Sequence, residues 1–142
     1  MDEIVYLFLF NNGDVPILAL DFLRGKSKEG FLYTTDLEVF KDGAEKPLME
    51  LDIACVCDGI ITIGEAKKNN TLANKIPEER RAVEKYYKLA RLVGANQLVF
   101  ATLSESWSQR TLDAVEHVVV DKRIKTRLLT RRELLSRPRS NG

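Results

Sequence analysis

Residues 48–67, LMELDIACVC followed by DG and then IITIGEAK, decide the fold that this sequence predicts. Both runs are mainly apolar, which fits buried strands. The Asp58-Gly59 pair between them is a strong signal for a two-residue hairpin turn. We therefore predict two antiparallel strands, Leu48–Cys57 and Ile60–Lys67.

The two-residue turn also fixes which residues face each other across this hairpin. Counting outward from the turn, Asp52 faces Glu65 and Glu50 faces Lys67. These four side chains share one face, because strand side chains alternate with period two. The opposite face is almost wholly apolar and is predicted to be the core side; it carries Leu51, Ile53, Cys55, Cys57, Ile60, Thr62, Gly64 and Ala66.

Two opposed carboxylates suggest a metal site. Their Cβ atoms would lie about 4.5–5.5 Å apart, and like charges there destabilise a sheet unless a cation compensates them. Mg²⁺ commonly takes one or two carboxylates and keeps water and phosphate oxygens as its other ligands. Asp52 and Glu65 would hold it, Lys67 would reach the attacking water or the phosphate, and Glu50 would orient Lys67. The alternative is a solvated sheet face with a Glu50–Lys67 salt bridge and an incidental acidic pair.

Turn and capping signals predict the remaining elements. In chain order we expect a strand over Glu3–Phe10, a helix from Asp14 to near Gly25, a strand over Phe31–Phe40, the hairpin, a helix over Pro77–Gly94, a strand over Gln97–Leu103, a helix opened by Ser106 and Gln109 and running through Val120, a strand over Ile124–Leu129, and a short helix capped by Thr130 and Glu133. Val15–Leu20 also fits a buried strand. The order predicts an α/β fold with a mixed central sheet flanked by helices.

Length and composition indicate one globular domain over residues 1–142, with a frayed tail at 137–142. The longest apolar run, Ile4–Phe10, is far below the roughly 20 residues of a membrane-spanning helix, so we expect a cytoplasmic protein without membrane contact. Cys55 and Cys57 lie on one side of a strand and are expected to be small core residues rather than a disulfide.

Charge is distributed unevenly along the chain. Residues 1–65 carry 13 acids and 5 bases, whereas residues 66–142 carry 17 bases and 8 acids. One half could hold cations while the other meets a polyanion; the alternative is a solvated surface whose charges happen to segregate. Candidate contacts to a phosphate backbone are Arg80, Arg81, Lys85, Lys88 and Arg91, and the stretch Lys122–Arg132.

The hairpin residues resemble the PD-(D/E)xK nuclease superfamily, which has the restriction-endonuclease-like fold. Its signature is an acidic residue on the second core strand, followed across a hairpin by Asp or Glu, any residue, and Lys. The family order of helix, three strands, helix and strand is similar to that expected over residues 15–103. The resemblance implies that Asp52 and Glu65 bind Mg²⁺, that the Ala66 carbonyl adds a ligand, and that Lys67 assists the nucleophilic water.

The sequence also departs from the family pattern. Leu51 stands where the signature has proline. Many members carry a Gln and a Tyr one turn apart on the helix after the lysine. Tyr86 and Tyr87 are present here, but the residues four positions earlier are Ala82 and Val83.

Three functional interpretations follow. The first is a Mg²⁺-dependent nuclease, with Mn²⁺ as an expected substitute, that hydrolyses DNA phosphodiester bonds; the preference for DNA over RNA comes from the resemblance. The second is a catalytically silent module of the same fold that binds nucleic acid or a protein partner. The third takes the chain as a fragment of a larger protein or as one half of a homodimer.

Overall fold

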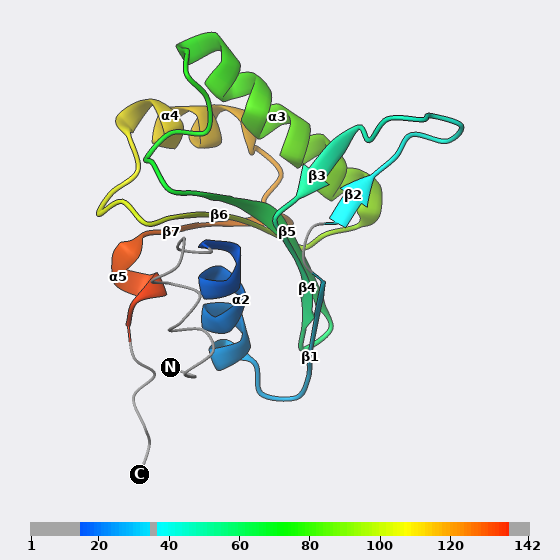
Figure 1. The fold of residues 1–142 in the computed structure, drawn as a ribbon, viewed down its shortest axis with the longest axis vertical. Helices are drawn as coiled ribbons and strands as arrows, with labels where there is room; N and C mark the ends of the chain where they lie inside the picture. Colours follow the sequence, from blue (N-terminus) through cyan, green and yellow to red (C-terminus); the bar gives the residue numbers. More distant parts are fainter. Residues whose placement is uncertain (1–14, 35–36, 137–142) are drawn as a thin grey trace.

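A central sheet with helices on both faces organises the molecule (Figure 1). The computed structural model describes residues 15–34 and 37–136. The main sheet has five strands in the spatial order β1 (Phe31–Thr34), β4 (Ile53–Cys57), β5 (Ile60–Lys67), β6 (Gln97–Thr102) and β7 (Lys125–Leu129). The pairs β1/β4 and β4/β5 are antiparallel, whereas β5/β6 and β6/β7 are parallel. The predicted α/β class with a mixed sheet is confirmed.

Two helical layers cover the sheet. On one face lie α2 (Val15–Lys26) and α5 (Arg131–Leu134), and on the other lie α3 (Ile76–Val93) and α4 (Gln109–Val118) (Figure 1). Strand residues therefore alternate between two cores. Ile53, Cys55 and Val99 pack with the α2 side, while Ile63 and Leu98 pack with the α3 side.

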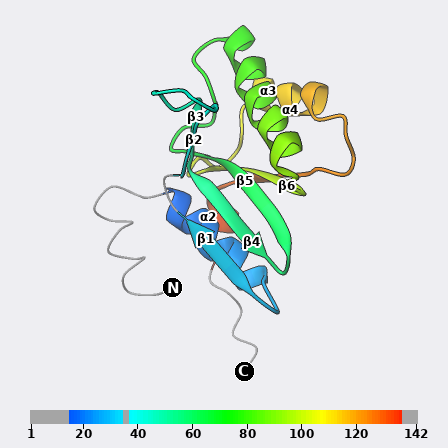
Figure 2. The same cartoon turned by 90° about the vertical axis from the view of Figure 1, so that its right-hand side faces the viewer.

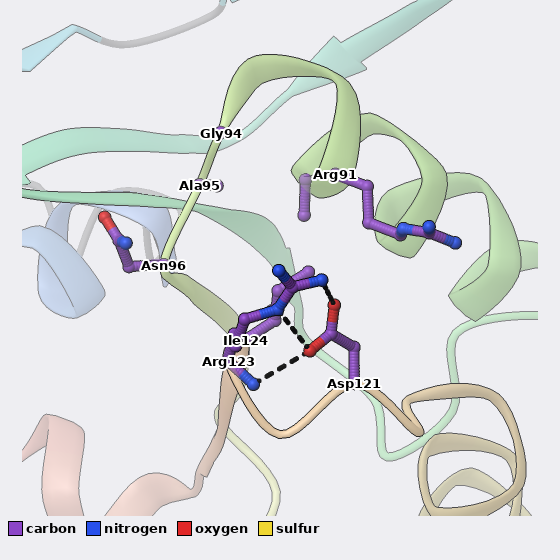
Figure 3. A pocket seen from close by; sticks show the side chains of 8 residues that line it. Arg91, Gly94, Ala95, Asn96, Asp121, Arg123 and Ile124 are labelled. Atoms are coloured by element: carbon purple, nitrogen blue, oxygen red, sulfur yellow. Dashed lines mark hydrogen bonds and ion pairs between the residues drawn. The ribbon is translucent and has the colours of Figure 1, made fainter.

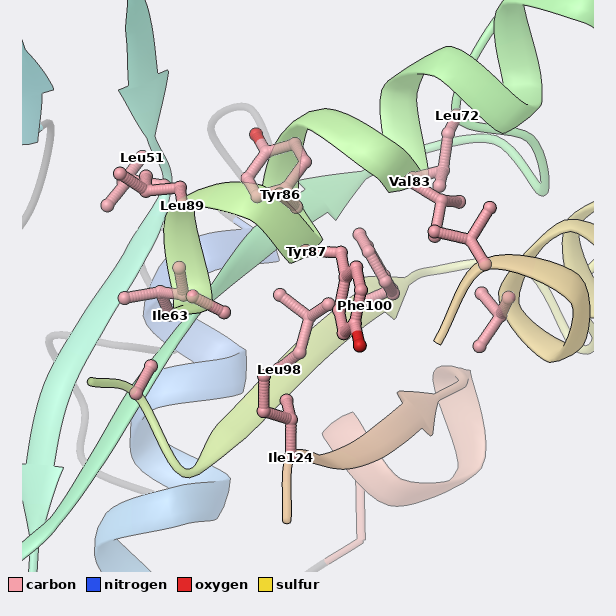
Figure 4. Packing of buried hydrophobic residues seen from close by; sticks show 14 of the residues in the cluster. Leu51, Ile63, Leu72, Val83, Tyr86, Tyr87, Leu89, Leu98, Phe100 and Ile124 are labelled. Atoms are coloured by element: carbon pink, nitrogen blue, oxygen red, sulfur yellow. The ribbon is translucent and has the colours of Figure 1, made fainter. Parts of the chain in front are cut away.

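The core beneath α3 is built around aromatic side chains (Figure 4). Phe100 is fully buried, and its ring meets the Tyr86 ring edge-on at 5.7 Å between centroids. Val83 and Leu98 are also fully buried. Burying a side chain of this kind stabilises the fold by about 1.5–3 kcal/mol. This packing fixes α3 over β5 and β6.

The predicted hairpin is confirmed around its turn. Asp58 and Gly59 have φ of +52° and +80°, which are the positive values that a type I′ turn requires. Cys57 pairs with Ile60, and the predicted register holds outward to the pair Ile53 and Gly64.

The predicted strands over residues 31–40 and 48–57 are wrong as single strands, because each is replaced by two shorter strands in different sheets. The described residues of the first include β1 and β2 (Leu37–Val39), and residues 48–57 include β3 (Met49–Leu51) and β4. β2 and β3 pair with each other in a separate two-stranded sheet that stands away from the main one (Figure 2). Each of the two segments thus contributes one strand to the main sheet and one to the small sheet.

The remaining boundaries agree closely with expectation, with one exception. The segment from Val15 is a helix rather than a strand, α3 ends at a left-handed Gly94, and the capping box of Thr130 and Glu133 is present. The exception is α4, whose N-cap is Ser108 and not Ser106. The Ser108 side chain accepts a hydrogen bond from the Thr111 N–H, as an N-cap residue should.

Two predictions lie outside the described residues: the strand over Glu3–Phe10 and the tail at 137–142. Among the helices that are described, none has the length and apolar character needed to cross a bilayer.

Candidate functional site

The candidate catalytic residues lie at one edge of the sheet. β5, β6 and β7 run parallel, so their carboxyl ends meet at this edge. β4 runs antiparallel to β5 and therefore begins there. Lys67 ends β5, and Asp52 directly precedes β4. Ligands of open α/β sheets commonly bind outside the carboxyl ends of strands.

Asp52 stands at the bend where the chain passes from β3 to β4. Its carboxylate Oδ2 accepts a hydrogen bond from the Ala66 N–H at 3.1 Å. The ladder between β4 and β5 ends at Ile53 and Gly64, two residues before Ala66. Asp52 thus supplies the acceptor that a continuing strand would have offered. This contact holds the carboxylate at the end of β5 even though Asp52 is not in a paired strand.

Glu65 and Lys67 project from the α3 side of β5. Their carboxylate Oε1 and ammonium Nζ lie 3.3 Å apart. Burial raises the pKa of the Glu65 carboxyl, and the negative charge of Asp52 raises it further, while Lys67 lowers it. Asp52 lies close enough to Glu65 for its charge to act on it, since the Asp52 carboxylate binds the N–H of the residue after Glu65. Asp52, Glu65 and Lys67 thus lie at the same edge of the sheet, but Asp52 precedes β4, and the predicted cross-strand pair of Asp52 with Glu65 is not part of the β4/β5 ladder.

Tyr86 on α3 is a member of this cluster that sequence reasoning did not assign. Its hydroxyl donates to the Glu50 carbonyl at 3.4 Å, and it also interacts with the Glu65 carboxylate, whose pKa it lowers. Burial raises the pKa of Tyr86, and the charges of Glu65 and Asp52 add to that effect. The Tyr86 hydroxyl therefore stays protonated at neutral pH and can donate its proton to the Glu50 carbonyl.

The predicted role of Glu50 is not supported by its position. Glu50 pairs with Glu38 in the β2/β3 sheet and not with Lys67. The reason is the bend at Asp52, which turns the chain out of the main sheet before Glu50 can reach Lys67. Within residues 15–34 and 37–136, the only ion pair of Lys67 is with Glu65.

The donor set suits a small hard cation. Asp52 and Glu65 give two carboxylates, the usual number for Mg²⁺. The Ala66 N–H points toward Asp52, and in an extended strand the carbonyl of the same residue points to the same side. That carbonyl is thus a third candidate oxygen. The described residues hold no cluster of three or more His, Cys, Asp or Glu side chains with metal-site geometry, so a cation here would need backbone, water or substrate oxygens as well.

A buried carboxylate anchors the loop that follows Lys67. Glu79 is 1 % exposed and accepts hydrogen bonds from the Leu72 N–H at 2.8 Å and the Ala73 N–H at 2.9 Å. The Thr111 hydroxyl donates to it at 2.5 Å, and Arg110 Nε lies 3.6 Å away. These contacts join the loop to α3 and α4, so the segment beside the cluster has a fixed path.

The basic residues predicted to contact phosphates lie on α3. Arg80, Arg81 and Lys85 are all exposed. Glu79 and Val83 mark the buried side of the helix, and at about 100° per residue Arg81 projects away from the sheet. No contact among the described residues links these three side chains to the Asp52 cluster.

Two other hollows lie away from the cluster. One of about 370 Å³ sits at the opposite edge of the sheet, below the end of α3, where Arg123 pairs with Asp121 at 2.9 Å (Figure 3). The other is an apolar groove of about 440 Å³ beside β1, where Leu32 is 74 % exposed. Neither is lined by Asp52, Glu65 or Lys67.

No family model, curated protein or solved structure matches this chain. The resemblance to the PD-(D/E)xK superfamily thus depends on the residues and the topology described above. Neither the residues nor the topology assigns a substrate by itself.

Proposed function

We propose that this chain is a metal-dependent nuclease of the PD-(D/E)xK superfamily, which hydrolyses DNA phosphodiester bonds with Mg²⁺, or with Mn²⁺ in its place. The observation that carries the proposal is that the Asp52 carboxylate binds the Ala66 N–H beside Glu65, while the Lys67 ammonium lies 3.3 Å from Glu65 and the Asp52 charge raises the Glu65 pKa. Like charges held together in a partly buried place favour a bound cation.

The order of elements supports the family assignment. Helix α2, strands β1, β4 and β5, helix α3 and strand β6 follow the family order of helix, three strands, helix and strand. The strands lie side by side in that same sequence in the sheet. β2 and β3 are then an excursion between the first two core strands. This arrangement is what a restriction-endonuclease-like core would require.

Each side chain has a separate task in this proposal. Asp52, Glu65 and the Ala66 carbonyl would hold Mg²⁺, which supplies a Lewis acid and lowers the pKa of water at that place. The Lys67 ammonium, held by Glu65, would stabilise negative charge that develops on the phosphate. The Tyr86 hydroxyl would keep the Glu65 carboxylate in its binding orientation.

Backbone contacts would come from the basic residues of the second half. Arg80, Arg81 and Lys85 are exposed and able to meet phosphates. Binding by such contacts releases counterions, so the affinity for DNA should fall steeply as salt rises.

Incubation of plasmid and linear DNA with Mg²⁺, Mn²⁺ or EDTA tests the proposal. Wild type should cut in either metal and not in EDTA, and the Lys67→Ala and Asp52→Ala variants should lose cutting. A Lys122→Ala variant serves as a control, because Lys122 is exposed and lies before β7, at the other edge of the sheet. Identical products from wild type, Lys67→Ala and Asp52→Ala in every metal would refute the catalytic assignment.

A silent nucleic-acid or protein-binding module is the second candidate. Two contacts favour it: the Asp52 hydrogen bond to Ala66 and the Glu65–Lys67 ion pair. Each gives these side chains a structural role that requires no catalysis. Calorimetric titration with Mg²⁺ separates the two candidates. The nuclease requires Mg²⁺ binding that Glu65→Gln removes, whereas a silent module requires none.

A further inference from the structure

The carboxyl edge of the sheet continues past the candidate catalytic cluster to α5. Three loops leave this edge, after β5, β6 and β7, and hydrogen bonds join them in series. The Leu103 N–H donates to the Lys67 carbonyl at 3.3 Å, and the Ser104 hydroxyl donates to the Lys68 carbonyl at 3.4 Å. The Arg131 N–H donates in turn to the Ser104 carbonyl at 3.1 Å. Lys68 and Arg131 are thus held on one continuous ledge.

Positive charge gathers along this ledge. Lys68, Arg131 and Arg132 are exposed, and none of them has an ion pair among the residues that the structure describes. The neighbouring carboxylate of Glu133 is engaged, because it accepts from the Thr130 N–H at 2.9 Å and the Thr130 hydroxyl at 2.5 Å. The cations are therefore free to meet an external anion.

A hollow of about 420 Å³ lies at the far end of the ledge. Arg131, Arg132 and Glu105 line it, together with Leu135 and Ser136. Glu105 is the one acid of this lining, so two guanidinium groups face a single carboxylate. The excess of positive charge suits a phosphate more than a carboxylate-rich partner or an uncharged one.

The two ends of β7 differ in charge arrangement. At its amino end, Arg123 is bound to Asp121 by paired contacts of 3.0 and 2.9 Å. Lys122 and Lys125 are exposed there and are the basic side chains left to meet an anion. At its carboxyl end, Arg131 and Arg132 are unpaired within the described residues. The basic stretch 122–132 is thus divided between opposite edges, and only one edge carries the opposed carboxylates.

We infer that a nucleic-acid strand lies along the ledge formed by Lys68, Ser104, Arg131 and Arg132, with its backbone phosphates on these residues and its scissile phosphate at Lys67. This inference rests on the proposed nuclease function and adds a binding path to it. Neighbouring strands are about 4.8 Å apart, so β5 and β7 are separated by about 10 Å. Along the axis of a duplex, where each strand rises about 3.4 Å per nucleotide, that length corresponds to about three nucleotides. The ledge therefore holds the phosphates flanking the cleaved bond on one side.

Fluorescence anisotropy with labelled duplex and single-stranded DNA in EDTA tests the ledge without cleavage. The double variant Arg131→Gln/Arg132→Gln removes two contacts, and Lys122→Gln/Lys125→Gln removes equal charge from the amino end of β7. Each lost phosphate contact should reduce the slope of log affinity against log salt by about 0.9 for duplex DNA and about 0.7 for single strands. We expect the ledge variant to bind at least tenfold more weakly with a slope reduced by about two contacts, and the control to match wild type.

Several outcomes would overturn the ledge: equal weakening by both double variants, wild-type affinity of the ledge variant, or absence of DNA binding by wild type. Circular dichroism of each variant checks that the fold is kept, and Lys68→Gln gives a second variant outside α5. Plasmid cleavage in Mg²⁺ separates the two proposals. Ledge-dependent binding without any cleavage refutes the nuclease and keeps the ledge, whereas cleavage with ledge-independent binding refutes the ledge alone.

Discussion

The Asp52 carboxylate accepts a hydrogen bond from the Ala66 N–H at 3.1 Å, at the point where β4 stops pairing with β5. One residue thereby joins a structural task to a candidate catalytic one. The hydrogen bond needs only an acceptor oxygen, while metal binding needs the negative charge. Substitutions can separate these two requirements.

We predict that Asp52→Asn keeps the fold and loses the reaction. The amide oxygen can still accept from Ala66, so the free energy of unfolding should stay within about 0.5 kcal/mol of wild type. Removal of the charge should lower Mg²⁺-dependent cleavage by about 100-fold or more. Asp52→Ala should lose the reaction and about 1 kcal/mol of stability as well. Urea unfolding and plasmid cleavage measure the two effects; full cleavage by Asp52→Asn would show that Asp52 has only the structural task.

Tyr86→Phe should raise the Mg²⁺ concentration needed for half-maximal cleavage. The ring would still pack against Phe100, but the hydroxyl that interacts with Glu65 would be gone. Tyr87→Phe is a matched control on the same helix, since the Tyr87 hydroxyl accepts from the Asp121 N–H at the other edge of the sheet. Titration of cleavage against Mg²⁺ for both variants checks this; an unchanged Mg²⁺ requirement for Tyr86→Phe would remove Tyr86 from the site.

The sequence allowed a good prediction of local structure around strong turn and cap signals. Asp58-Gly59 fixed the register from Ile53 to Gly64, because a two-residue turn with positive φ permits one pairing. The break at Asp52 was not predicted because the run 48–57 contains no glycine or proline to mark it. What splits that run is pairing between β2 and β3, a non-local interaction that leaves no periodic signal.

The candidate site shows the same limit. Glu65 and Lys67 could be placed on one face from strand alternation alone. Strand alternation alone does not predict that α3 covers the face that carries Glu65 and Lys67, because a solvated face or a metal pocket fits the same pattern. Tyr86 was missed because an aromatic residue at helical spacing usually belongs to the core, and Tyr86 does pack there with one side while its hydroxyl reaches Glu65.

Gly64→Ala should be severely destabilising. Gly64 pairs with Val99 between β5 and β6, and a Cβ atom on it would lie 1.8 Å from the Val99 carbonyl oxygen. Because that oxygen belongs to the backbone, the two strands would have to separate, and we expect a loss of about 4 kcal/mol or more. Gly25→Ala is the control: nothing lies within 4 Å of its Cβ position, and alanine favours the helix by up to about 1 kcal/mol. Thermal unfolding of both variants tests this prediction, and equal melting temperatures for Gly64→Ala and Gly25→Ala would contradict it.

The carboxylate of Asp58 predicts a loss of stability in acid. It accepts hydrogen bonds from the backbone N–H groups of Lys28, Glu29 and Gly30 at 2.9, 2.7 and 3.0 Å, which lower the pKa of Asp58 to about 2. An unfolded Asp titrates near about 3.9. The folded pKa is therefore depressed, so the contribution of this carboxylate to stability is complete above about pH 4 and disappears as pH falls toward 2.

Asp58→Asn tests this contribution, since Asn-Gly also favours the type I′ turn and keeps one acceptor oxygen. We expect the variant to be less stable than wild type at neutral pH, because an uncharged acceptor binds the three N–H groups less strongly. Its stability should also fall less between about pH 4 and 2, so the two curves should converge as Asp58 takes up its proton. Urea unfolding of both proteins at a series of pH values gives the comparison. A constant difference across that interval would mean that the Asp58 charge does not hold the segment between α2 and β1.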